Sequence, residues 1–496
     1  MTALLPDDPH DRALVGHVHP PTWVNPTPEG RYNLVVIGGG PAGLVAALGA
    51  AGLGARVALV EKHLLGGDCL VFGCVPSKAV LRVGHAAHAA RDAARFGVST
   101  GPVDVDFSAA MERMRSIRAG IAPHDSAERL KREGVDVFLG DARFTGPDTI
   151  AVNGTELRFT RCCIATGARA VLPTIPGIET VGVLTNETLF SLTERPERLT
   201  VVGAGVIGCE MAQAFARLGS QVTLVDPSER VLSREDPSAS ARVAAQLVAD
   251  GVTLALGTGV QRFEGPGADG RIAVLSDGTS IPSDAILVAV GRRPNLDLDL
   301  ERAGIASTRT GVTVDVHLRT SNPRVYAAGD VIGQARFTHA ADHQARIVIG
   351  NALFFGRSRV DRLVIPRVTY TDPEVAAVGV SPAEAASDPS LTAWTVSIGE
   401  TDRGRTDGET HGFCTIVADG AGRIRGALIV GEGAGELLAP ITLAMTQGIP
   451  LGRIASTIHP YPTRSEVVFK VASAYNKGRL KPLYRRVLAW FLSLRR

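Results

Sequence analysis

The chain has 496 residues and a formal net charge of +2, from 52 Lys and Arg against 50 Asp and Glu. A single hydrophobic core rarely serves so long a chain, so about three domains are expected. The small net charge gives no electrostatic case for a nucleic-acid partner, and six cysteines are too few for a secreted disulfide framework. A reducing cytoplasm is therefore the expected compartment.

The first segment, residues 1–30, is rich in Pro, His and Asp and lacks a hydrophobic period. It predicts an arm or a disordered leader, and it lacks the basic and apolar regions of a signal peptide. Residues 34–55 carry no charge and are long enough to span a bilayer. Glycines and a proline interrupt them where a strand must turn into a helix, so a soluble nucleotide-binding unit is the preferred interpretation.

Two glycine-rich turns follow the same plan. A predicted strand at 32–37 leads into the first turn, a helix runs to Gly54, and a strand at 56–60 ends at an acid. The same order of predicted elements occurs again later in the chain, with a strand at 199–202, a helix at 209–218 and a strand at 221–225. The turns hold Gly38, Gly40 and Gly43 in the first case and Gly203, Gly205 and Gly208 in the second, and the acids are Glu61 and Asp226.

Each unit has the features of a dinucleotide site. The glycines let the backbone approach a pyrophosphate, whose charge suits the N-terminus of the helix. The terminal acid, at the same distance along the chain from the third glycine in both units, accepts hydrogen bonds from ribose hydroxyls. One such pattern is a weak signal, but two with strand, helix and acid predict two dinucleotide sites.

Cys69 and Cys74 lie in a Gly-rich stretch, residues 66–78, just after the first unit. Two thiols this close, beside a site for a redox cofactor, can cycle between dithiol and disulfide. A structural disulfide or a pair of inert buried thiols is the alternative. Cys162 and Cys163 are adjacent on a predicted strand and are interpreted as small buried hydrophobic residues rather than a second redox pair.

The dithiol and the two glycine turns together resemble the pyridine nucleotide–disulfide oxidoreductases, flavoenzymes that include dihydrolipoamide dehydrogenase, glutathione reductase and mercuric reductase. Strands at 369–379, 412–419 and 424–430, with a helix at 432–447, are similar to the family's dimerisation domain. The resemblance implies an α/β fold with two doubly wound dinucleotide-binding domains, for FAD and NAD, and a C-terminal α+β dimerisation domain with an antiparallel sheet. It also implies a homodimer.

The implied domains are an N-terminal arm, an FAD-binding domain in two parts, an NAD(P)-binding domain, a dimerisation domain and a basic amphipathic tail. Their expected bounds are 1–30 for the arm, 31–180 and 291–360 for FAD, 181–290 for NAD(P), 361–475 for the dimerisation domain and 476–496 for the tail.

The resemblance also implies roles for particular residues. Cys74 would be the thiolate beside the flavin and Cys69 the interchange thiol, with Lys78 near the flavin and paired with Glu210. Asp330 would hold the ribityl chain of FAD, and a helix starting near Thr338 and His339 would point its N-terminus at the flavin. The remaining expected cofactor positions are Gly140, Thr166, Gly167, Val260, Gly291 and Gly329.

The expected cofactors are FAD and a nicotinamide nucleotide. Asp226 favours NADH, because a 2′-phosphate beside that carboxylate would be repelled. Arg230 and Arg234 lie shortly after Asp226, and their positive charges would weaken the preference for NADH over NADPH. NADPH therefore stays an alternative. No resident metal ion is expected.

One position departs from the pattern of the disulfide reductases. Their acid–base histidine stands directly before Pro-Thr-x-Ser-Glu, where this chain has Tyr461. A phenol, with an ordinary pKa near 10, cannot serve as a general base near neutrality. His459 and Glu466 are the other candidate catalytic residues; His459 either replaces the missing base or is a packed or solvated histidine.

Tyrosine at this place is similar to mercuric reductases, although no cysteine follows Cys414 to form their C-terminal pair. The leading hypothesis is therefore a mercuric reductase-like enzyme that passes electrons from NAD(P)H through flavin and dithiol to a small-molecule or metal-ion acceptor. The alternatives are a dihydrolipoamide dehydrogenase and a redox partner, recruited to a membrane, that donates to a quinone or a protein.

The tail supports the last alternative. Residues 477–496 contain several Lys and Arg and no acid. Apolar residues fall at helical spacing: Leu480, Leu483, Tyr484, Val487, Leu488, Phe491 and Leu494. A basic amphipathic helix suits an anionic surface such as the inner face of a membrane. Packing of its apolar face on the dimerisation domain is the competing interpretation.

Overall fold

The computed structural model describes residues 4–267, 270–479 and 482–495, without the side chains of 482–484. The chain forms two compact units. The first comprises Met1–Glu229 and Asp250–Arg362, and the second comprises Arg230–Ala249 and Leu363–Arg496.

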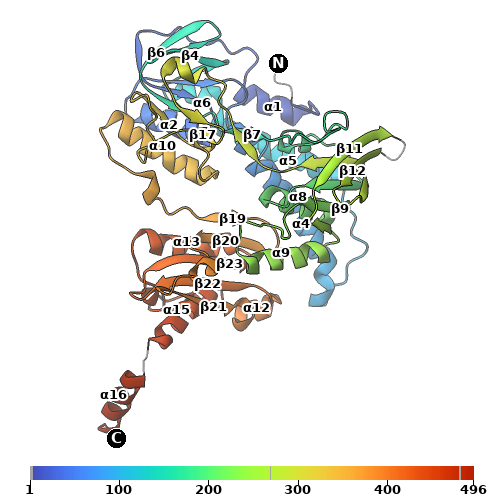
Figure 1. Ribbon diagram of the computed structural model, residues 1–496, viewed down its shortest axis with the longest axis vertical. Coiled ribbons are helices and arrows are strands. Elements are labelled where there is room, and N and C mark those ends of the chain that lie inside the picture. The colour runs from blue at the N-terminus through green and yellow to red at the C-terminus, as the bar shows by residue number, and fades with distance from the viewer. Residues whose placement is uncertain (1–3, 268–269, 480–481, 496) are drawn as a thin grey trace. The chain divides into compact units, whose positions relative to one another are not determined.

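The first unit is built around a seven-stranded sheet. Six strands follow the order β3-β2-β1-β6-β5-β4, and β18 also pairs with β6, at residues 162–164. Strands β1, β2, β3, β6 and β18 are parallel where they pair, and β4 and β5 add an antiparallel edge. The strands are β1 Arg31–Ile37, β2 Val57–Glu61, β3 Val135–Leu139, β4 Ala142–Gly146, β5 Thr149–Val152, β6 Thr155–Ile164 and β18 Val325–Ala327. Helices α2 (Pro41–Gly52) and α10 (Thr338–Leu353) pack side by side (Figure 1).

The second glycine turn belongs to a smaller sheet of the same unit. Its four parallel strands have the order β10-β9-β8-β14. They are β8 Arg198–Val202, β9 Gln221–Asp226, β10 Thr253–Leu256 and β14 Ala285–Val288, with α8 at Val206–Arg217. A three-stranded antiparallel sheet accompanies it, formed by β11 Val260–Gly267, β12 Gly270–Leu275 and β13 Ser280–Ser283. Both predicted strand-turn-helix units are thus present, with bounds shifted by one to three residues.

The dithiol segment forms two consecutive helices, α3 (Gly67–Val71) and α4 (Cys74–Asp92), and α4 packs on α8. The other elements of this unit are α5 Phe107–Ile121, α6 Ala127–Arg132, α7 Asn186–Leu189, β7 Ala168–Ala170, β15 Arg292–Pro294, β16 Ser307–Thr308 and β17 Gly311–Val312. Cys162 and Cys163 on β6 are fully buried, as expected of small core residues.

The N-terminal segment differs from one of its two predicted forms. A disordered leader is wrong for residues 9–18, because Pro9–Val18 form helix α1. Asp8 caps this helix by accepting a hydrogen bond from the Asp11 N–H at 2.8 Å. Leu14 and Val18 are fully buried, one helical turn apart. The apolar residues Ala13, Leu14, Val15 and Val18 do not form a clear helical period, so the helix was not evident from the sequence.

The second unit contains the predicted antiparallel sheet, in the order β19-β20-β23-β22-β21. Its strands are β19 Arg367–Thr369, β20 Glu374–Gly379, β21 Leu391–Ser397, β22 Phe413–Asp419 and β23 Ile424–Gly431. The segment predicted as one strand at 369–379 is two, because a turn around Pro373, which has no N–H to donate, separates β19 from β20. The helices are α9 Pro237–Ala249, α11 Pro382–Ala385, α12 Asp402–Asp407, α13 Ala434–Thr446, α14 Leu451–Ile454, α15 Glu466–Gly478 and α16 Pro482–Ser493.

Helix α9 belongs to this second unit. The segment before it carries Asp236, which accepts a hydrogen bond from the Ala383 N–H at 3.0 Å, and Glu235, which pairs with Arg367 at 2.9 Å. The domain bounds expected from sequence place α9 in the nucleotide-binding domain, and those bounds stay predictions.

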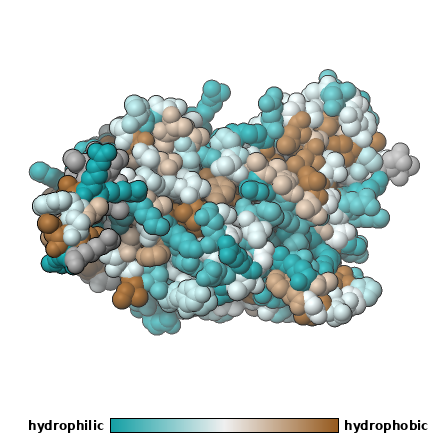
Figure 2. Space-filling view, turned by 90° about the horizontal axis from the view of Figure 1, so that it is seen from below, coloured by the Kyte–Doolittle hydropathy of each residue, from teal (hydrophilic) through white to brown (hydrophobic). Residues whose placement is uncertain are grey.

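The tail forms helix α16, and its described apolar side chains are exposed. Leu480, and the side chains of Leu483 and Tyr484, lie outside the described residues. Over the described part of the chain, no helix is both long and apolar enough to cross a bilayer. On the face that Figure 2 shows, hydrophobic side chains gather in several groups separated by hydrophilic ones.

Candidate active site

The first glycine turn leaves no room for side chains at two of its three glycines. Gly38 has φ +109°, and a Cβ there would lie 2.4 Å from the Ala165 carbonyl oxygen. A Cβ at Gly43 would lie 1.8 Å from the carbonyl oxygen of Gly38. At Gly40 the nearest atom to such a Cβ is 3.8 Å away, and no side chain caps the helix that starts there. An anion such as a pyrophosphate fits this open, uncapped helix N-terminus.

The second turn repeats this geometry. Gly203 also has φ +109°, a Cβ at Gly208 would meet the Gly203 carbonyl oxygen at 1.8 Å, and a Cβ at Gly205 would meet nothing within 4 Å. Helix α8 likewise starts without a side-chain cap. The residues present therefore fit two dinucleotides, FAD and NAD(P)H.

The two terminal acids are held in the same way. Glu61 accepts hydrogen bonds from the N–H groups of Gly39 and His63, both at 2.6 Å. Asp226 accepts them from Ala204 at 2.7 Å and Ser228 at 2.8 Å. Burial raises the pKa of Glu61, although the two hydrogen bonds act to lower it. Each carboxylate is thus fixed beside its glycine turn, where a ribose would lie.

The other expected cofactor positions lie in several places of the first unit. The Thr166 hydroxyl and the Asn295 amide each donate to the other's carbonyl oxygen at 2.8 Å. The N–H of Gly329 donates to the buried Gln344 side chain at 2.7 Å. Burial raises the pKa of Asp330.

The remaining four are backbone or packing positions. Gly167 and Gly291 have φ +68° and +135°. Gly140 donates its N–H to the Glu61 carbonyl oxygen at 2.9 Å. Val260 packs against the hydrophobic core that includes Val202 and Ile286, so its side chain has a structural role in the sheet.

The dithiol lies where two helices and a hydroxyl meet. Cys69 is in the middle of α3 and Cys74 is the first residue of α4. The hydroxyl of Thr338, the first residue of α10, donates to the Cys69 sulfur at 3.4 Å and lies 3.5 Å from the Cys74 sulfur. Both cysteines are free thiols in this structure. The predicted start of a helix at Thr338 is confirmed, and the His339 ring stacks on Phe337.

The two thiols differ in acidity. Hydrogen bonds from Cys69 and Thr338, together with the charge of Lys78, lower the pKa of Cys74. The pKa of Cys69 is raised, because its proton is shared with the Cys74 sulfur and its surroundings are desolvated. Cys74 is also at a helix N-terminus, which favours a thiolate. Of the pair, Cys74 is the thiol that ionises.

Lys78 lies one turn further along α4. Its ammonium group pairs with Glu210 of α8 at 2.8 Å, and the Glu210 carboxylate is only 3% exposed. A buried carboxylate needs such a partner. The pair expected from the resemblance is therefore present, and it joins the dithiol helix to the helix of the second nucleotide turn.

Sequence reasoning missed the residues that hold Asp68, the neighbour of Cys69. The Asp68 carboxylate accepts hydrogen bonds from Asn186 at 2.8 Å and from Arg292 at 3.0 Å. Asn186 also donates to the Phe72 carbonyl oxygen at 3.3 Å, and the Arg292 guanidinium lies 3.8 Å from Asp330. These partners are over 100 residues away from Asp68 in sequence, so no local pattern could reveal them.

The other candidate catalytic residues lie in the second unit: His459 and Tyr461 on the segment before α15, and Glu466 as the first residue of that helix. The Tyr461 hydroxyl donates to Asp402 at 3.1 Å, and this hydrogen bond raises the pKa of the phenol. Glu466 pairs with Lys470 at 3.0 Å. The His459 ring packs on Phe469, with 5.6 Å between ring centroids, and its Nε2 is buried without a hydrogen-bond partner. This contact supports the interpretation of His459 as a packed histidine, which stays a prediction.

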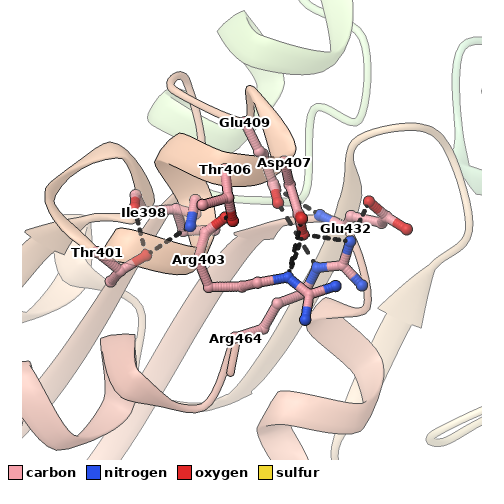
Figure 3. A network of polar contacts seen from close by, with 9 residues as sticks. Ile398, Thr401, Arg403, Thr406, Asp407, Glu409, Glu432 and Arg464 are labelled. Atoms are coloured by element: carbon pink, nitrogen blue, oxygen red, sulfur yellow. Dashed lines mark hydrogen bonds and ion pairs between the residues drawn. The ribbon is translucent and has the colours of Figure 1, made fainter. Parts of the chain in front are cut away.

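The same segment is anchored by Arg464, between Thr463 and Ser465. Figure 3 shows Arg464 reaching the carboxylates of Asp407, at 3.0 Å, and Glu432. Asp407 also pairs with Arg403 at 2.7 Å, and the network includes Glu409. Burial raises the pKa of Glu409. This network holds the loop that carries Tyr461.

Comparison with known proteins identifies the family. Residues 32–345 match the family described as pyridine nucleotide-disulphide oxidoreductase, and residues 365–472 match its dimerisation domain. The chain belongs to this family. It is an FAD-dependent disulfide oxidoreductase that uses NAD(P)H, with the fold expected from the sequence.

Two kinds of relative with curated names are similar to the chain. The chain is 34% identical to a mercuric reductase of Lysinibacillus sphaericus over 90% of this chain and 83% of that protein. It is 32% identical to a dihydrolipoyl dehydrogenase of Chlamydia muridarum over 88% of this chain and 95% of that protein. The fold is also similar to that of a solved structure, a Cu(II) complex of the HOCl-induced flavoprotein disulfide reductase RclA from Escherichia coli. The TM-score is 0.80 and the sequence identity 28%, over 90% of this chain and 100% of that chain.

Proposed function

We propose that the enzyme passes two electrons from NADH, through FAD and the Cys69–Cys74 pair, to a soft metal ion or another small acceptor. FAD, when bound, accepts a hydride and supplies two electrons to the disulfide. Cys74 then holds the thiolate at the flavin side, and Cys69, which is less acidic, is the interchange thiol. The observation that carries the proposal is the pair of sulfurs sharing the Thr338 hydroxyl, at 3.4 and 3.5 Å.

The chemistry of the acceptor follows from the two thiols. A soft metal ion binds thiolates in preference to harder ligands, and two such ligands lie together here. The names of the relatives, mercuric reductase and a Cu(II) complex of a disulfide reductase, agree with such an acceptor. Tyr461, in the role we propose, stays protonated at neutral pH and exchanges its hydrogen bond to Asp402 for one to a thiolate or to a group bound there.

The test is a panel of acceptors on one preparation of the protein. NADH oxidation is measured with Hg(II), Cu(II), lipoamide and a quinone in turn. The proposal expects metal-dependent turnover that exceeds turnover with lipoamide or the quinone. Faster turnover with lipoamide would favour dihydrolipoamide dehydrogenase activity, and faster turnover with the quinone would favour a redox partner.

The nucleotide preference is a separate prediction. Asp226→Ser should reduce the ratio of kcat/KM with NADH to kcat/KM with NADPH. The substitution removes the repulsion between the Asp226 carboxylate and a 2′-phosphate, worth on the order of 1–3 kcal/mol. The measurement is kcat/KM with each nucleotide and the same acceptor. Glu61→Asp, at the equivalent place in the other nucleotide unit, serves as the control and should leave the ratio unchanged. A wild-type enzyme that strongly prefers NADPH would contradict the assignment of Asp226.

The dimerisation domain supports a homodimer. We propose that the segment with Tyr461 and Glu466 faces Cys69 of the second chain, as the resemblance to the family implies. Mixing Cys69→Ser with Tyr461→Phe protomers should then restore part of the activity, since one of the two sites in each mixed dimer is intact. Full activity in a monomer, measured by sedimentation at the assay concentration, would be incompatible with this arrangement.

The tail carries a second, independent proposal, contact with an anionic membrane from the cytoplasmic side. Its support is that Val487, Leu488, Trp490 and Phe491 are each between 44% and 62% exposed, on a helix that also carries Arg485 and Arg486. Sedimentation with vesicles of phosphatidylglycerol, against vesicles of phosphatidylcholine, tests it. The full chain should sediment with the anionic vesicles alone, and a chain ending at residue 479 with neither; equal recovery of both chains would reject it.

A further inference from the structure

The N-terminal helix α1 buries charge as well as apolar surface against the first unit. It packs on α5, and Asp11 is only 1% exposed. The Asp11 carboxylate pairs with the guanidinium of Arg118 at 2.5 Å, and that side chain is 2% exposed. A buried guanidinium needs a carboxylate beside it, because the cost of removing it from water is high. The N-terminal segment supplies this carboxylate from 107 residues away.

The same guanidinium reaches the helix that carries Cys69. Its Nη2 donates to Asp11, and its Nη1 donates to the carbonyl oxygen of Val71 at 2.8 Å. Val71 is the last residue of α3. Carbonyl groups at the end of a helix lack partners within the helix, and a cation near them is favourable.

A single turn such as α3 has little stability of its own, so its position depends on what holds its ends. The next carbonyl, that of Phe72, accepts a hydrogen bond from Asn186. Outside groups thus fix both carbonyls at the end of α3. Of these two contacts, only the one at Val71 depends on the N-terminal segment.

We propose that Asp11 is a positioning residue for the interchange thiol: by pairing with Arg118 it holds the end of α3 and hence Cys69 beside Cys74. The inference rests on the proposed function only in the role given to Cys69. Without the Asp11 charge, Arg118 has no buried carboxylate beside it and withdraws toward water, and the bond to Val71 is lost. Cys69 then becomes more mobile and more accessible.

The arm offers a matched control. Asp8 belongs to the same segment and pairs with Arg115 of α5 at 2.5 Å. Asp8→Asn therefore removes an arm ion pair without touching the bond to α3. Asp11→Asn removes the pair that leads to Val71.

The experiment uses the full-length, FAD-loaded protein, reduced with dithiothreitol so that the result does not depend on the route from NADH. The rate at which iodoacetamide alkylates Cys69 is followed by mass spectrometry. Asp11→Asn should raise this rate about tenfold or more, because α3 opens more often and exposes the thiol to the reagent, and Asp8→Asn should change it by less than about twofold. The proposal is overturned if both variants change the alkylation rate of Cys69 equally. It is also overturned if Asp11→Asn lowers the melting temperature but leaves that rate unchanged.

If Asp11→Asn fails to fold, the double variant Asp11→Asn with Arg118→Met is used to test whether the Arg118 contact positions Cys69. It removes both buried charges, so folding no longer suffers from an unpaired ion, but it still lacks the bond to Val71. It must show the same faster alkylation of Cys69. A rate equal to that of the wild type would reject the role of the Arg118 contact. Failure of NADH to reduce the wild-type dithiol would count against the proposed function and leave this comparison intact.

Discussion

Cys74→Ser is expected to lower the rate of acceptor reduction by NADH by at least about 10³-fold, because a serine hydroxyl can neither form the disulfide nor ionise near neutrality. The variant should also lose the long-wavelength absorbance that a thiolate beside a flavin produces. The measurements are steady-state turnover and the visible spectrum of the reduced, FAD-loaded protein. Cys414→Ser, at a buried cysteine of the second unit, is the control and should keep both.

The acidity of Cys74 adds a dependence on pH. Hydrogen bonds from Cys69 and Thr338 and the charge of Lys78 lower the pKa of Cys74 to about 6. The thiolate therefore exists above that pH and is protonated below it, so the long-wavelength absorbance should fade as the pH falls through about 6. If the Cys74→Ser protein keeps the band, the assignment of the two thiols is reversed.

Turnover with lipoamide is expected to be poor, and Tyr461→His should raise it. When lipoamide is reduced, an acid–base group must take the proton of the attacking Cys69 thiol and deliver it to the sulfur that leaves the lipoamide disulfide, and help of this kind is typically worth about 10²–10⁴-fold. The Tyr461 phenol cannot provide it, because its hydrogen bond to Asp402 raises its pKa further above neutrality. The measurement is kcat/KM for dihydrolipoamide and for lipoamide in the wild type and in Tyr461→His.

His459→Ala is the matched comparison. The His459 ring packs on Phe469 and its Nε2 is buried, so its removal should leave the lipoamide rate unchanged apart from a loss of stability. Rapid lipoamide turnover by the wild type, lost only in His459→Ala, would show that the base has moved to His459. Dihydrolipoamide dehydrogenase activity would then be the better description.

Much of the fold could be predicted because its signals are local. The two glycine turns combine a buried strand, a turn without room for side chains and a terminal acid within one short segment, and both are present at the expected residues. The antiparallel sheet was also predicted, from short runs of β-branched and other apolar residues bounded by turn residues. The pair of Lys78 and Glu210 was available from the resemblance, and the structure contains it.

The contacts that support the site could not be predicted. Asp68 is held by Arg292, and Val71 by Arg118 and Asp11, each from a distant part of the chain. A charged residue in a sequence is usually a surface residue, so the burial of Asp11 has no local signal. The network around Arg464 is hidden for the same reason, since its carboxylates come from two other segments, residues 407–409 and Glu432.

The central claim is that electrons from NADH reach the disulfide between Cys69 and Cys74. The direct measurement is alkylation of the FAD-loaded protein, purified in air, with and without NADH under anaerobic conditions, followed by mass spectrometry of each cysteine-containing peptide. We predict that Cys69 and Cys74 are unlabelled before NADH and labelled after it, while Cys162, Cys163, Cys209 and Cys414, which are buried, are unlabelled in both samples. Equal labelling of Cys69 and Cys74 with and without NADH would contradict the account.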